Sequence, residues 1–245
     1  MTRVGVVGLG YWGPNLARNF DQLAELAWIC DAKGSVRKTF AGRYPRARAT
    51  SDYADLLADD SLDAIVVSTP VPTHYELAKQ ALESGKHVLV ERPPAMRGEE
   101  MDELVRLSEE RDLVCMPGHL LLYHPGIRKV KALVDAGTLG EVLCVYGNRQ
   151  NLGIIRQDEN ALWSLGVHDL SVILYLLGEE PDEVVAHGRA LLPGTGVEDD
   201  HLLRADDGDL PHLVRVEPGQ VHVRDLPRRE LQIAEDDVFD PGPRE

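Results

Sequence analysis

The chain has 245 residues, of which 43% are hydrophobic and 27% are charged, and its formal net charge is −15 at neutral pH. These proportions are those of a globular protein of one or two domains, and the acidity argues against nucleic acid or an anionic membrane as a partner. No apolar run reaches the length of a membrane span, no signal-peptide pattern opens the chain, and Cys30, Cys115 and Cys144 are widely spaced, so we expect a cytoplasmic protein without disulfides or a metal site.

The most specific motif begins where the first apolar run ends. Val4–Val7 is predicted to be a strand, and it is followed by Gly-x-Gly-x-x-Gly at Gly8, Gly10 and Gly13, then by Pro14, which suits the first turn of a helix. In a dinucleotide-binding unit the first glycine permits the tight turn, the second lets the backbone approach a pyrophosphate, and the third lets the helix approach the strand. The phosphates then lie at the positive end of the helix. The alternative is a strand–helix–strand unit that keeps its glycines for packing alone.

The next apolar run, Leu26–Cys30, ends at Asp31, 18 residues past Gly13. A carboxylate there can accept hydrogen bonds from both hydroxyls of a ribose and would repel a 2′-phosphate, which favours NAD over NADP. Tyr11 and Trp12, inside the glycine loop, either pack over the pyrophosphate or cover the start of the helix. The helix is expected to face the sheet with three apolar residues that recur at helical spacing: Leu16, Phe20 and Leu23.

Short apolar runs alternate with amphipathic helices up to residue 118. Further strands are predicted at Ala64–Ser68, His87–Val90 and Leu113–Met116, with a weaker one at Ala47–Thr50, and helices at Tyr75–Ser84 and Glu99–Arg111. This alternation is typical of a doubly wound parallel sheet. Residues 1–118 are therefore predicted to form a Rossmann dinucleotide-binding domain of the α/β class.

The pattern changes after residue 118. A helix is predicted at Pro125–Ala136, a long strand at Glu141–Leu152, and a helix within Ala161–Leu177 that carries Leu170, Ile173, Leu174 and Leu177 on one face. Short strand-like runs follow at Glu183–Leu191, His201–Ala205, His212–Val216, Val221–Arg224 and Leu231–Ala234. Residues 119–234 are predicted to form a smaller α+β domain with an open, mostly antiparallel sheet that is covered on one face. The acidic tail at 235–245 has a composition typical of disordered chain ends.

Together with the glycine motif, four further segments resemble one protein family. They are Ser68–Pro70, Thr73–His74, Val88–Pro93 and Leu165–Asp169. The combination resembles the Gfo/Idh/MocA family of glucose–fructose oxidoreductase, inositol dehydrogenase and rhizopine-catabolism proteins, over residues 1 to about 190. Within it, the surroundings of His168 look most like nucleotide-sugar 3-dehydrogenases and sugar 3-ketoreductases. The resemblance implies a sugar or nucleotide-sugar substrate bound on one face of the second sheet, and a homodimer or homotetramer built on the other.

One residue departs from the family's hallmark. The family has Glu-Lys-Pro, with the lysine beside the nicotinamide and the substrate hydroxyl, whereas this chain has Glu91-Arg92-Pro93. A guanidinium cannot exchange protons near neutral pH, although it can bind a substrate oxygen or carboxylate and stabilise an alkoxide. Proton transfer would then be the task of His168, which matches the family's helix-borne histidine and titrates near neutrality. Arg92 and His168 are therefore the catalytic candidates.

The resemblance and the motifs give two sets of binding candidates. The cofactor set is Gly8, Gly10, Tyr11, Trp12, Gly13, Asp31, Ser68, Thr69, Pro70, His74, Glu91 and Arg92. The substrate set is His119, Tyr123, His124, Arg149, Arg156, Ser164 and His168. Several members have a second explanation: Pro70 suits an ordinary turn, Arg149 and Arg156 can be surface charge, and Asp169, next to His168, suits a capping role. Ser164 stands where many family members have an aspartate.

Three functions remain open from the sequence. The first is an NAD-dependent oxidoreductase that moves a hydride between nicotinamide and a sugar or nucleotide-sugar hydroxyl or ketone. The second keeps the cofactor but performs elimination, epimerisation or cyclisation with transient or no redox change, because Arg92 replaces the lysine. The third is a catalytically silent NAD-binding partner of another enzyme.

Overall fold

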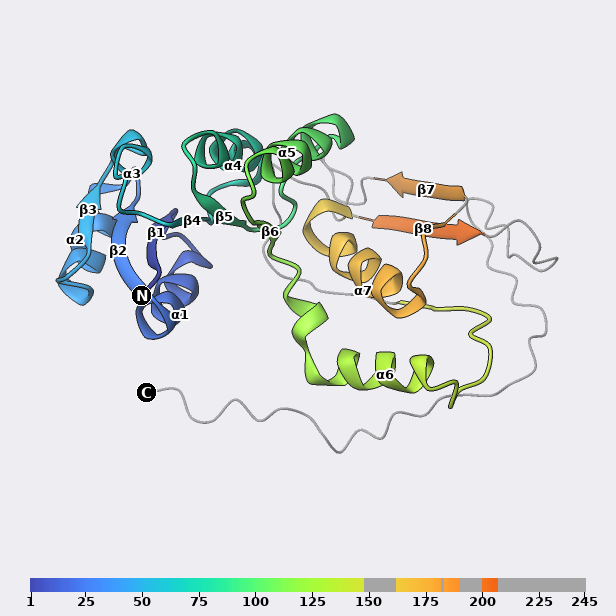
Figure 1. The fold of residues 1–245 in the computed structure, drawn as a ribbon. Helices are drawn as coiled ribbons and strands as arrows, with labels where there is room; N and C mark the ends of the chain where they lie inside the picture. The colour runs from blue at the N-terminus through green and yellow to red at the C-terminus, as the bar shows by residue number, and fades with distance from the viewer. Residues whose placement is uncertain (148–161, 182, 190–199, 207–245) are drawn as a thin grey trace.

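The computed structural model describes residues 1–147, 162–181, 183–189 and 200–206 (Figure 1). Its N-terminal part is built on one sheet of six strands: β1 (Arg3–Val7), β2 (Glu25–Cys30), β3 (Arg48–Thr50), β4 (Ala64–Val67), β5 (His87–Val90) and β6 (Cys115–Pro117). All neighbouring strands pair in parallel, in the order β3-β2-β1-β4-β5-β6. The order reverses between β1 and β4, as in a doubly wound dinucleotide-binding sheet. The predicted fold class is confirmed.

Helices cover both faces of this sheet. They are α1 (Gly13–Leu23), α2 (Gly34–Arg43), α3 (Ala54–Leu57), α4 (His74–Glu83) and α5 (Gly98–Glu110), with a short 3₁₀ turn, η1 (Val71–Thr73), before α4. Strand β4 shows why its sequence is apolar without alternation: Ile65 and Val67 pack in the cluster under α4 and α5, while Val66 packs in the cluster under α1 and α2. The sheet is therefore buried on both faces.

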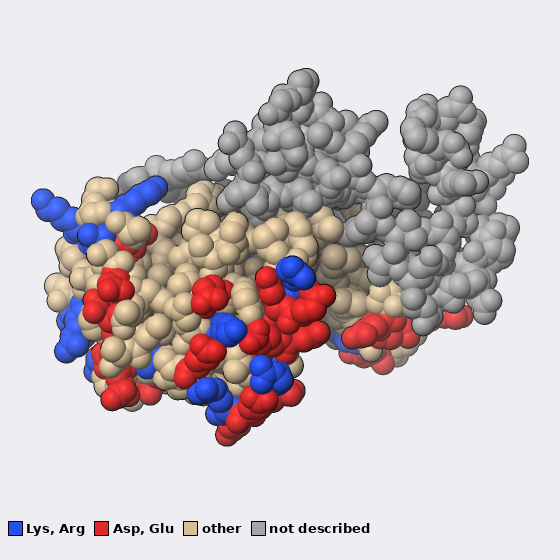
Figure 2. Space-filling model, turned by 90° about the horizontal axis from the view of Figure 1, so that it is seen from above, with Lys and Arg blue, Asp and Glu red and all other residues tan. Residues whose placement is uncertain are grey.

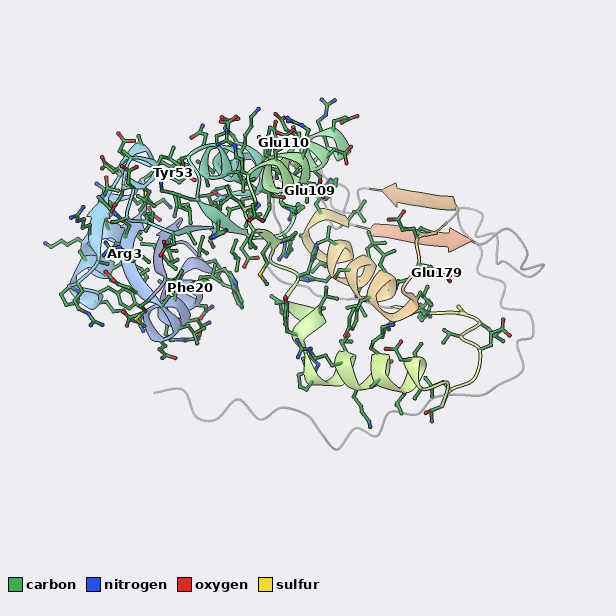
Figure 3. The ribbon with its side chains drawn as sticks, viewed as in Figure 1. Arg3, Phe20, Tyr53, Glu109, Glu110 and Glu179 are labelled. Carbon is green, nitrogen blue, oxygen red and sulfur yellow. The ribbon has the colours of Figure 1, made fainter. Side chains whose placement is uncertain are left out.

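The predicted inner face of α1 is partly wrong. Leu16 and Phe20 are half-buried against the core, but Leu23 is 77% exposed, and the buried residues of the helix are Gly13 and Ala17. A glycine and an alanine form the contact because they let the helix axis lie close to β1. Figure 3 labels Phe20 on α1 and Tyr53, the residue before α3.

The strand at the edge of the sheet begins two residues later than predicted. Cys115 pairs with Val88 and Pro117 with Val90, so β6 runs over Cys115–Pro117 in place of Leu113–Met116. Lys79 on α4 and Glu103 on α5 form an ion pair of 2.8 Å across the outer surface of these helices. On the face shown in Figure 2, acidic side chains are interspersed with basic ones, and no extended basic patch is visible among the described residues.

The second region follows the sheet through a 3₁₀ turn. Its described elements are η2 (Leu120–Tyr123), α6 (Pro125–Asp135), the π-helical turn η3 (Leu162–Gly166), α7 (Val167–Leu177) and the antiparallel pair β7 (Glu183–Arg189) and β8 (Asp200–Asp206). Helix α7 ends at Gly178 in the left-handed conformation, φ +75°, a common helix terminus. No helix in the described ranges has both the length and the apolar character needed to cross a bilayer.

One prediction for this region is wrong where the structure describes it. Glu141–Gly147 contains no strand, and the rest of the predicted strand at Glu141–Leu152 lies outside the described residues. On α7, Leu174 and Leu177 are 42% and 38% exposed, while Val167, His168 and Leu176 are buried. The runs predicted at His212–Val216, Val221–Arg224 and Leu231–Ala234 and the tail at 235–245 also lie outside the described residues.

Candidate functional site

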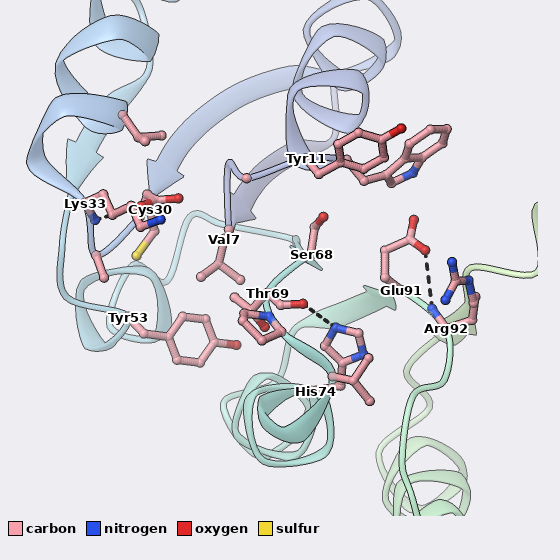
Figure 4. A pocket seen from close by; sticks show the side chains of 18 of the residues that line it. Val7, Tyr11, Cys30, Lys33, Tyr53, Ser68, Thr69, His74, Glu91 and Arg92 are labelled. Carbon is pink, nitrogen blue, oxygen red and sulfur yellow. Dashed lines mark hydrogen bonds between the residues drawn. The ribbon is translucent and has the colours of Figure 1, made fainter. Parts of the chain in front are cut away.

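A cavity of about 740 Å³ lies along the carboxyl ends of four neighbouring strands (Figure 4). In the order of the sheet, its wall is formed by Asp31 after β2, Gly8 after β1, Ser68 after β4, and Glu91 with Arg92 after β5. This edge of an open α/β sheet, at the reversal of strand order, is the usual place for a ligand. Eleven of the predicted cofactor residues line it: Gly8, Gly10, Tyr11, Trp12, Asp31, Ser68, Thr69, Pro70, His74, Glu91 and Arg92.

Two glycines of the glycine turn have no room for a side chain, and the third has free space beside it. Gly8 has φ +85°, and a Cβ on it would lie 2.4 Å from the Ser68 carbonyl oxygen; a Cβ on Gly13 would lie 2.0 Å from the Gly8 carbonyl oxygen. A Cβ on Gly10 would meet nothing within 4 Å and would project into free space beside the cavity. Gly13 therefore serves packing behind the cavity, whereas Gly10 keeps the backbone open to a ligand.

The start of α1 suits an anion. Its N-cap, Trp12, makes no side-chain hydrogen bond to the first turn, and Pro14 occupies that turn without an N–H group. The Asn15 N–H donates to the Trp12 carbonyl oxygen at 2.9 Å, and the positive end of the helix dipole lies where the glycine loop enters the helix. This is the arrangement that holds a pyrophosphate, so the residues present fit a dinucleotide.

Asp31 is fixed by backbone groups and keeps free acceptor capacity. Its Oδ2 accepts a hydrogen bond of 2.8 Å from the Leu9 N–H, and its Oδ1 accepts one of 2.8 Å from the Lys33 N–H. Arg37 donates from Nη1 to the Asp31 carbonyl oxygen at 2.6 Å. Each carboxylate oxygen has two lone pairs, so both can still accept from a ribose hydroxyl.

His74 connects the two loops that form the middle of the cavity. Its ring is 1% exposed; Nδ1 lies 2.8 Å from the Pro93 carbonyl oxygen, and Nε2 lies 2.7 Å from the Thr69 carbonyl oxygen. A neutral imidazole has one N–H and donates one of these bonds, while the doubly protonated ring donates both. In either form the ring ties the segment after β4 to the segment after β5.

Glu91 and Arg92 form the far end of the cavity. The Glu91 Oε2 accepts a hydrogen bond of 3.3 Å from the Arg92 backbone N–H, and a Cβ on Gly118 would lie 3.0 Å from that same oxygen. Burial raises the pKa of Glu91, and the Arg92 N–H, the Arg92 charge and His74 oppose this rise. The Arg92–Pro93 peptide bond is cis. The Arg92 Nε is buried and has no hydrogen-bond partner among the described residues.

His168 reaches the same cavity from the second region. It lies in the first turn of α7, is 9% exposed, and lines the cavity together with Leu120 of η2. The two catalytic candidates, Arg92 and His168, therefore lie on one cavity although 76 residues separate them in the chain. Ser164, on η3, is half-buried and does not line the cavity.

The remaining substrate candidates lie elsewhere. His119 is half-buried beside Arg92, and burial together with the Arg92 charge lowers its pKa. Tyr123 is 56% exposed, with the Arg128 guanidinium 5.1 Å from its ring centre, and His124 caps α6 by accepting a hydrogen bond of 3.1 Å from the Gly126 N–H. None of these three lines the cavity. Arg149 and Arg156 lie outside the described residues.

Sequence reasoning missed the residues at the end of the cavity beyond Asp31. Lys33, Val36, Ser51 and Tyr53 line it there, and burial raises the pKa of Tyr53, whose hydroxyl donates to the Leu77 carbonyl oxygen at 2.8 Å. Only their place in the sequence could have indicated these four residues, because they follow the carboxyl ends of the predicted strands at Leu26–Cys30 and Ala47–Thr50. Within the described ranges, no group of three or more His, Cys, Asp or Glu side chains is placed to hold a metal ion.

Comparison with protein families gives two matches along the chain. Residues 2–119 match the model described as GFO_IDH_MocA, "Oxidoreductase family, NAD-binding Rossmann fold", and residues 127–206 match the model of the GFO/IDH/MocA C-terminal domain. The first match contains the whole parallel sheet, and the second contains α7, β7, β8 and all of α6 except its first two residues.

Several curated proteins are similar. UDP-N-acetylglucosamine 3-dehydrogenase of Acidithiobacillus ferrooxidans is 31% identical over 191 residues, which is 77% of this chain and 58% of that protein. Myo-inositol 2-dehydrogenase of Thermotoga maritima is 28% identical over 93% of this chain and 69% of its own length. The 2,7-anhydro-N-acetylneuraminate hydratase of Escherichia coli is 29% identical over 82% of this chain and 57% of its own length.

Solved structures agree on the fold. The structure of GenD2 from gentamicin A biosynthesis, in complex with NAD, has a TM-score of 0.72 and 27% identity over 82% of this chain and 61% of that one. The structure of yvaA from Bacillus subtilis has a TM-score of 0.75 at 24% identity, over 85% of this chain and 62% of that one, and shows the fold alone. The chain spans less than two thirds of the length of most of these relatives.

Proposed function

Because the chain belongs to the Gfo/Idh/MocA family of NAD-binding oxidoreductases, we propose that it moves a hydride between nicotinamide and a hydroxyl or ketone carbon of a sugar or nucleotide sugar. The observation that carries the proposal is the single cavity that joins the glycine turn, Asp31, Arg92 and His168. The names of two relatives, a UDP-N-acetylglucosamine 3-dehydrogenase and a myo-inositol 2-dehydrogenase, support a polyhydroxylated substrate.

The cofactor-binding residues follow the order of the strands. Asp31 would accept hydrogen bonds from the ribose of the adenosine half, and the glycine turn with the start of α1 would hold the pyrophosphate. Glu91 and Arg92 would lie at the nicotinamide end, two strands further along the sheet. When bound, NAD supplies the hydride acceptor. The carboxylate at Asp31 favours NAD over NADP because it repels a 2′-phosphate.

The chain's own residues would divide the remaining work. His168 would accept the proton of the substrate hydroxyl during oxidation and return it during reduction. Arg92 would donate hydrogen bonds to the same oxygen and stabilise its developing negative charge, because a guanidinium keeps its protons near neutral pH. The substrate would enter between the two regions, with residues 1–118 as the dinucleotide-binding domain and residues 119–234 as the substrate-binding domain. We further propose a cytoplasmic homodimer or homotetramer.

A second function has one observation in its favour. Arg92 stands where the family has the lysine, and two relatives, at 29% identity, carry the name of a hydratase. Chemistry without net oxidation, such as elimination, would use Arg92 as an anion clamp and His168 as the proton carrier.

The test has two stages. The full chain is titrated with NAD⁺ and NADH, and then incubated with each cofactor and with UDP-N-acetylglucosamine or myo-inositol while the absorbance of reduced nicotinamide and the products are followed. A change in reduced nicotinamide supports the oxidoreductase, and product without net change supports the second function. Cofactor binding with neither result identifies a silent partner. No affinity for either cofactor form contradicts the proposal.

The role of His168 has its own variant. His168→Asn should lower turnover by about 10²- to 10⁴-fold and leave NADH affinity within about twofold, because it removes proton transfer and not cofactor contacts. His87→Asn is the matched control, since His87 lies at the opposite end of β5 from the cavity. Equal loss of turnover in both variants contradicts the assignment.

A further inference from the structure

We propose that the substrate carries a carboxylate and that Arg92 binds it, an inference that rests on the proposed function and names the substrate class of the same site. The starting observation is an unpaired cation. The Arg92 Nε is buried without a hydrogen-bond partner, and the guanidinium has no Asp or Glu oxygen within 4.0 Å among the described residues. Arg92 as a whole is half-buried, but burying the Nε donor of a charged group without a hydrogen-bond partner is unfavourable, so an anion that enters the cavity gains by pairing with it.

The neighbouring groups compensate this charge only in part. Glu91 interacts with the Arg92 charge, but its Oε2 accepts from the Arg92 backbone N–H, and no ion pair with the guanidinium within 4.0 Å is formed among the described residues. Burial works against the charged form of Glu91. The pKa of His119 is lowered by burial and by the Arg92 charge, so His119 is held toward its neutral form. Among the described residues, the far end of the cavity therefore keeps a guanidinium that is free to pair with an anionic ligand.

The cofactor's own pyrophosphate is the other possible anion, and the strand order argues against it. The glycine turn follows β1 and Arg92 follows β5, with β4 between them. Neighbouring strands lie about 4.8 Å apart, so about 10 Å separates the two positions. The pyrophosphate has donors of its own at the start of α1, where no side chain caps the helix. The anion at Arg92 is therefore assigned to the substrate.

Arginine in place of lysine fits this role. A guanidinium presents parallel N–H groups that match the two oxygens of a carboxylate, whereas an ammonium acts as a point charge. A guanidinium has five N–H groups, so a carboxylated sugar can pair its acid group with two of them while the reacting hydroxyl faces His168 and accepts from another. A neutral sugar supplies hydroxyl oxygens to these donors but no negative charge.

The experiment compares D-glucuronate with D-glucose, which differ in a carboxylate against a CH₂OH group. Each is titrated, at equal ionic strength, into the full chain labelled with ¹⁵N-arginine, with and without NADH. The Nε–H resonance of Arg92 is assigned by its loss in Arg92→Lys. We expect glucuronate to shift this resonance saturably and to bind about tenfold or more tightly than glucose. Arg92→Met should abolish the preference and Arg92→Lys should retain part of it. The control is Arg97→Met, because Arg97 pairs with Glu99 on the surface and does not line the cavity.

Three results overturn the inference. They are no shift with glucuronate, equal binding of glucuronate and glucose, and a preference that survives in Arg92→Met. A variant Arg92→Met that loses about tenfold or more in NADH affinity, with the sugar preference unchanged, assigns Arg92 to the pyrophosphate. Failure of the proposed function would show separately, as absent NADH affinity in the unmodified protein, because the titration without NADH still tests Arg92.

Discussion

The two regions of the chain differ in how their side chains are buried. All but two of the buried apolar residues lie between positions 4 and 107, on the two faces of the parallel sheet; the exceptions among the described residues are Val167 and Leu176. Both regions expose some large apolar side chains, but in the second region those described as exposed outnumber the buried ones: Leu120, Tyr123, Leu139, Leu143, Tyr146, Leu174 and Leu177. The cavity follows this division, since Leu120 and His168 are its lining residues from the second region. Cofactor binding should therefore depend on the packing of the first region, and proton transfer on where the second region holds α7.

The glycine turn allows the most severe disruption of the first region. Gly13→Ala should destabilise the protein by about 3 kcal/mol or more and remove measurable NADH binding, because the new Cβ would lie 2.0 Å from the Gly8 carbonyl oxygen. The matched variant is Gly10→Ala, whose Cβ meets nothing within 4 Å. Thermal unfolding and NADH fluorescence should show a stable Gly10→Ala protein with weakened binding. Normal stability in both variants would mean that the turn is not as closely packed as described.

Matched leucines test the difference in burial directly. Leu104→Ala, at a fully buried position on α5, should lower the free energy of unfolding by about 2 to 5 kcal/mol, whereas Leu174→Ala, at 42% exposure on α7, should lower it by less than about 1 kcal/mol. Denaturant unfolding of both variants measures this. Similar losses would show that the second region is as tightly packed around α7 as the first is around its sheet.

A substitution at Asp31 tests the cofactor-binding end of the cavity without changing the substrate end. Asp31→Asn should weaken NADH binding by about 10- to 100-fold, because the loss of a charged acceptor removes about 1.5 to 3 kcal/mol of hydrogen bonding, and it should improve NADPH binding relative to NADH. Parallel titrations of both cofactors give the ratio. An unchanged ratio would contradict the role assigned to this carboxylate.

The smallest effect is electrostatic and lies at the boundary of the two regions. Arg92→Met should raise the pKa of both His119 and Glu91, because each is lowered by the Arg92 charge. With its lowered pKa, folded His119 binds fewer protons than unfolded His119 just below pH 6.5, so its contribution to stability rises with pH up to about pH 6.5. The variant should flatten this rise. NMR titration of the His119 ring measures the shift, and a fall in its pKa would contradict the geometry.

The sequence predicted the first region well because its signals are local. Apolar runs that end in Gly8, Asp31, Ser68 or Glu91 place those residues at one edge of any parallel sheet, whatever the details of packing. The face of α1 was wrong at Leu23 because helical spacing does not say how closely Gly13 brings the helix to the strand. Ser51 and Tyr53 were missed because no motif marks them.

The second region was harder to predict because its signals depend on partners. The apolar run in Glu141–Gly147 is typical of a strand, but Leu143 and Tyr146 are 69% and 83% exposed there. An apolar run becomes a strand only when another strand pairs with it, and one chain segment does not show its partner. His168 could be found only through the family resemblance, since a lone histidine on a helix has no distinguishing spacing.

The arrangement of strand ends makes cofactor choice and substrate choice separable. Asp31 follows β2 and Arg92 follows β5, so three strand spacings, about 14 Å, lie between them. Substitutions that far apart with no shared partner generally act independently. Evolution or design can therefore exchange the preferred nicotinamide coenzyme at one end of this sheet edge and retune the recognised sugar at the other, each without disturbing its counterpart.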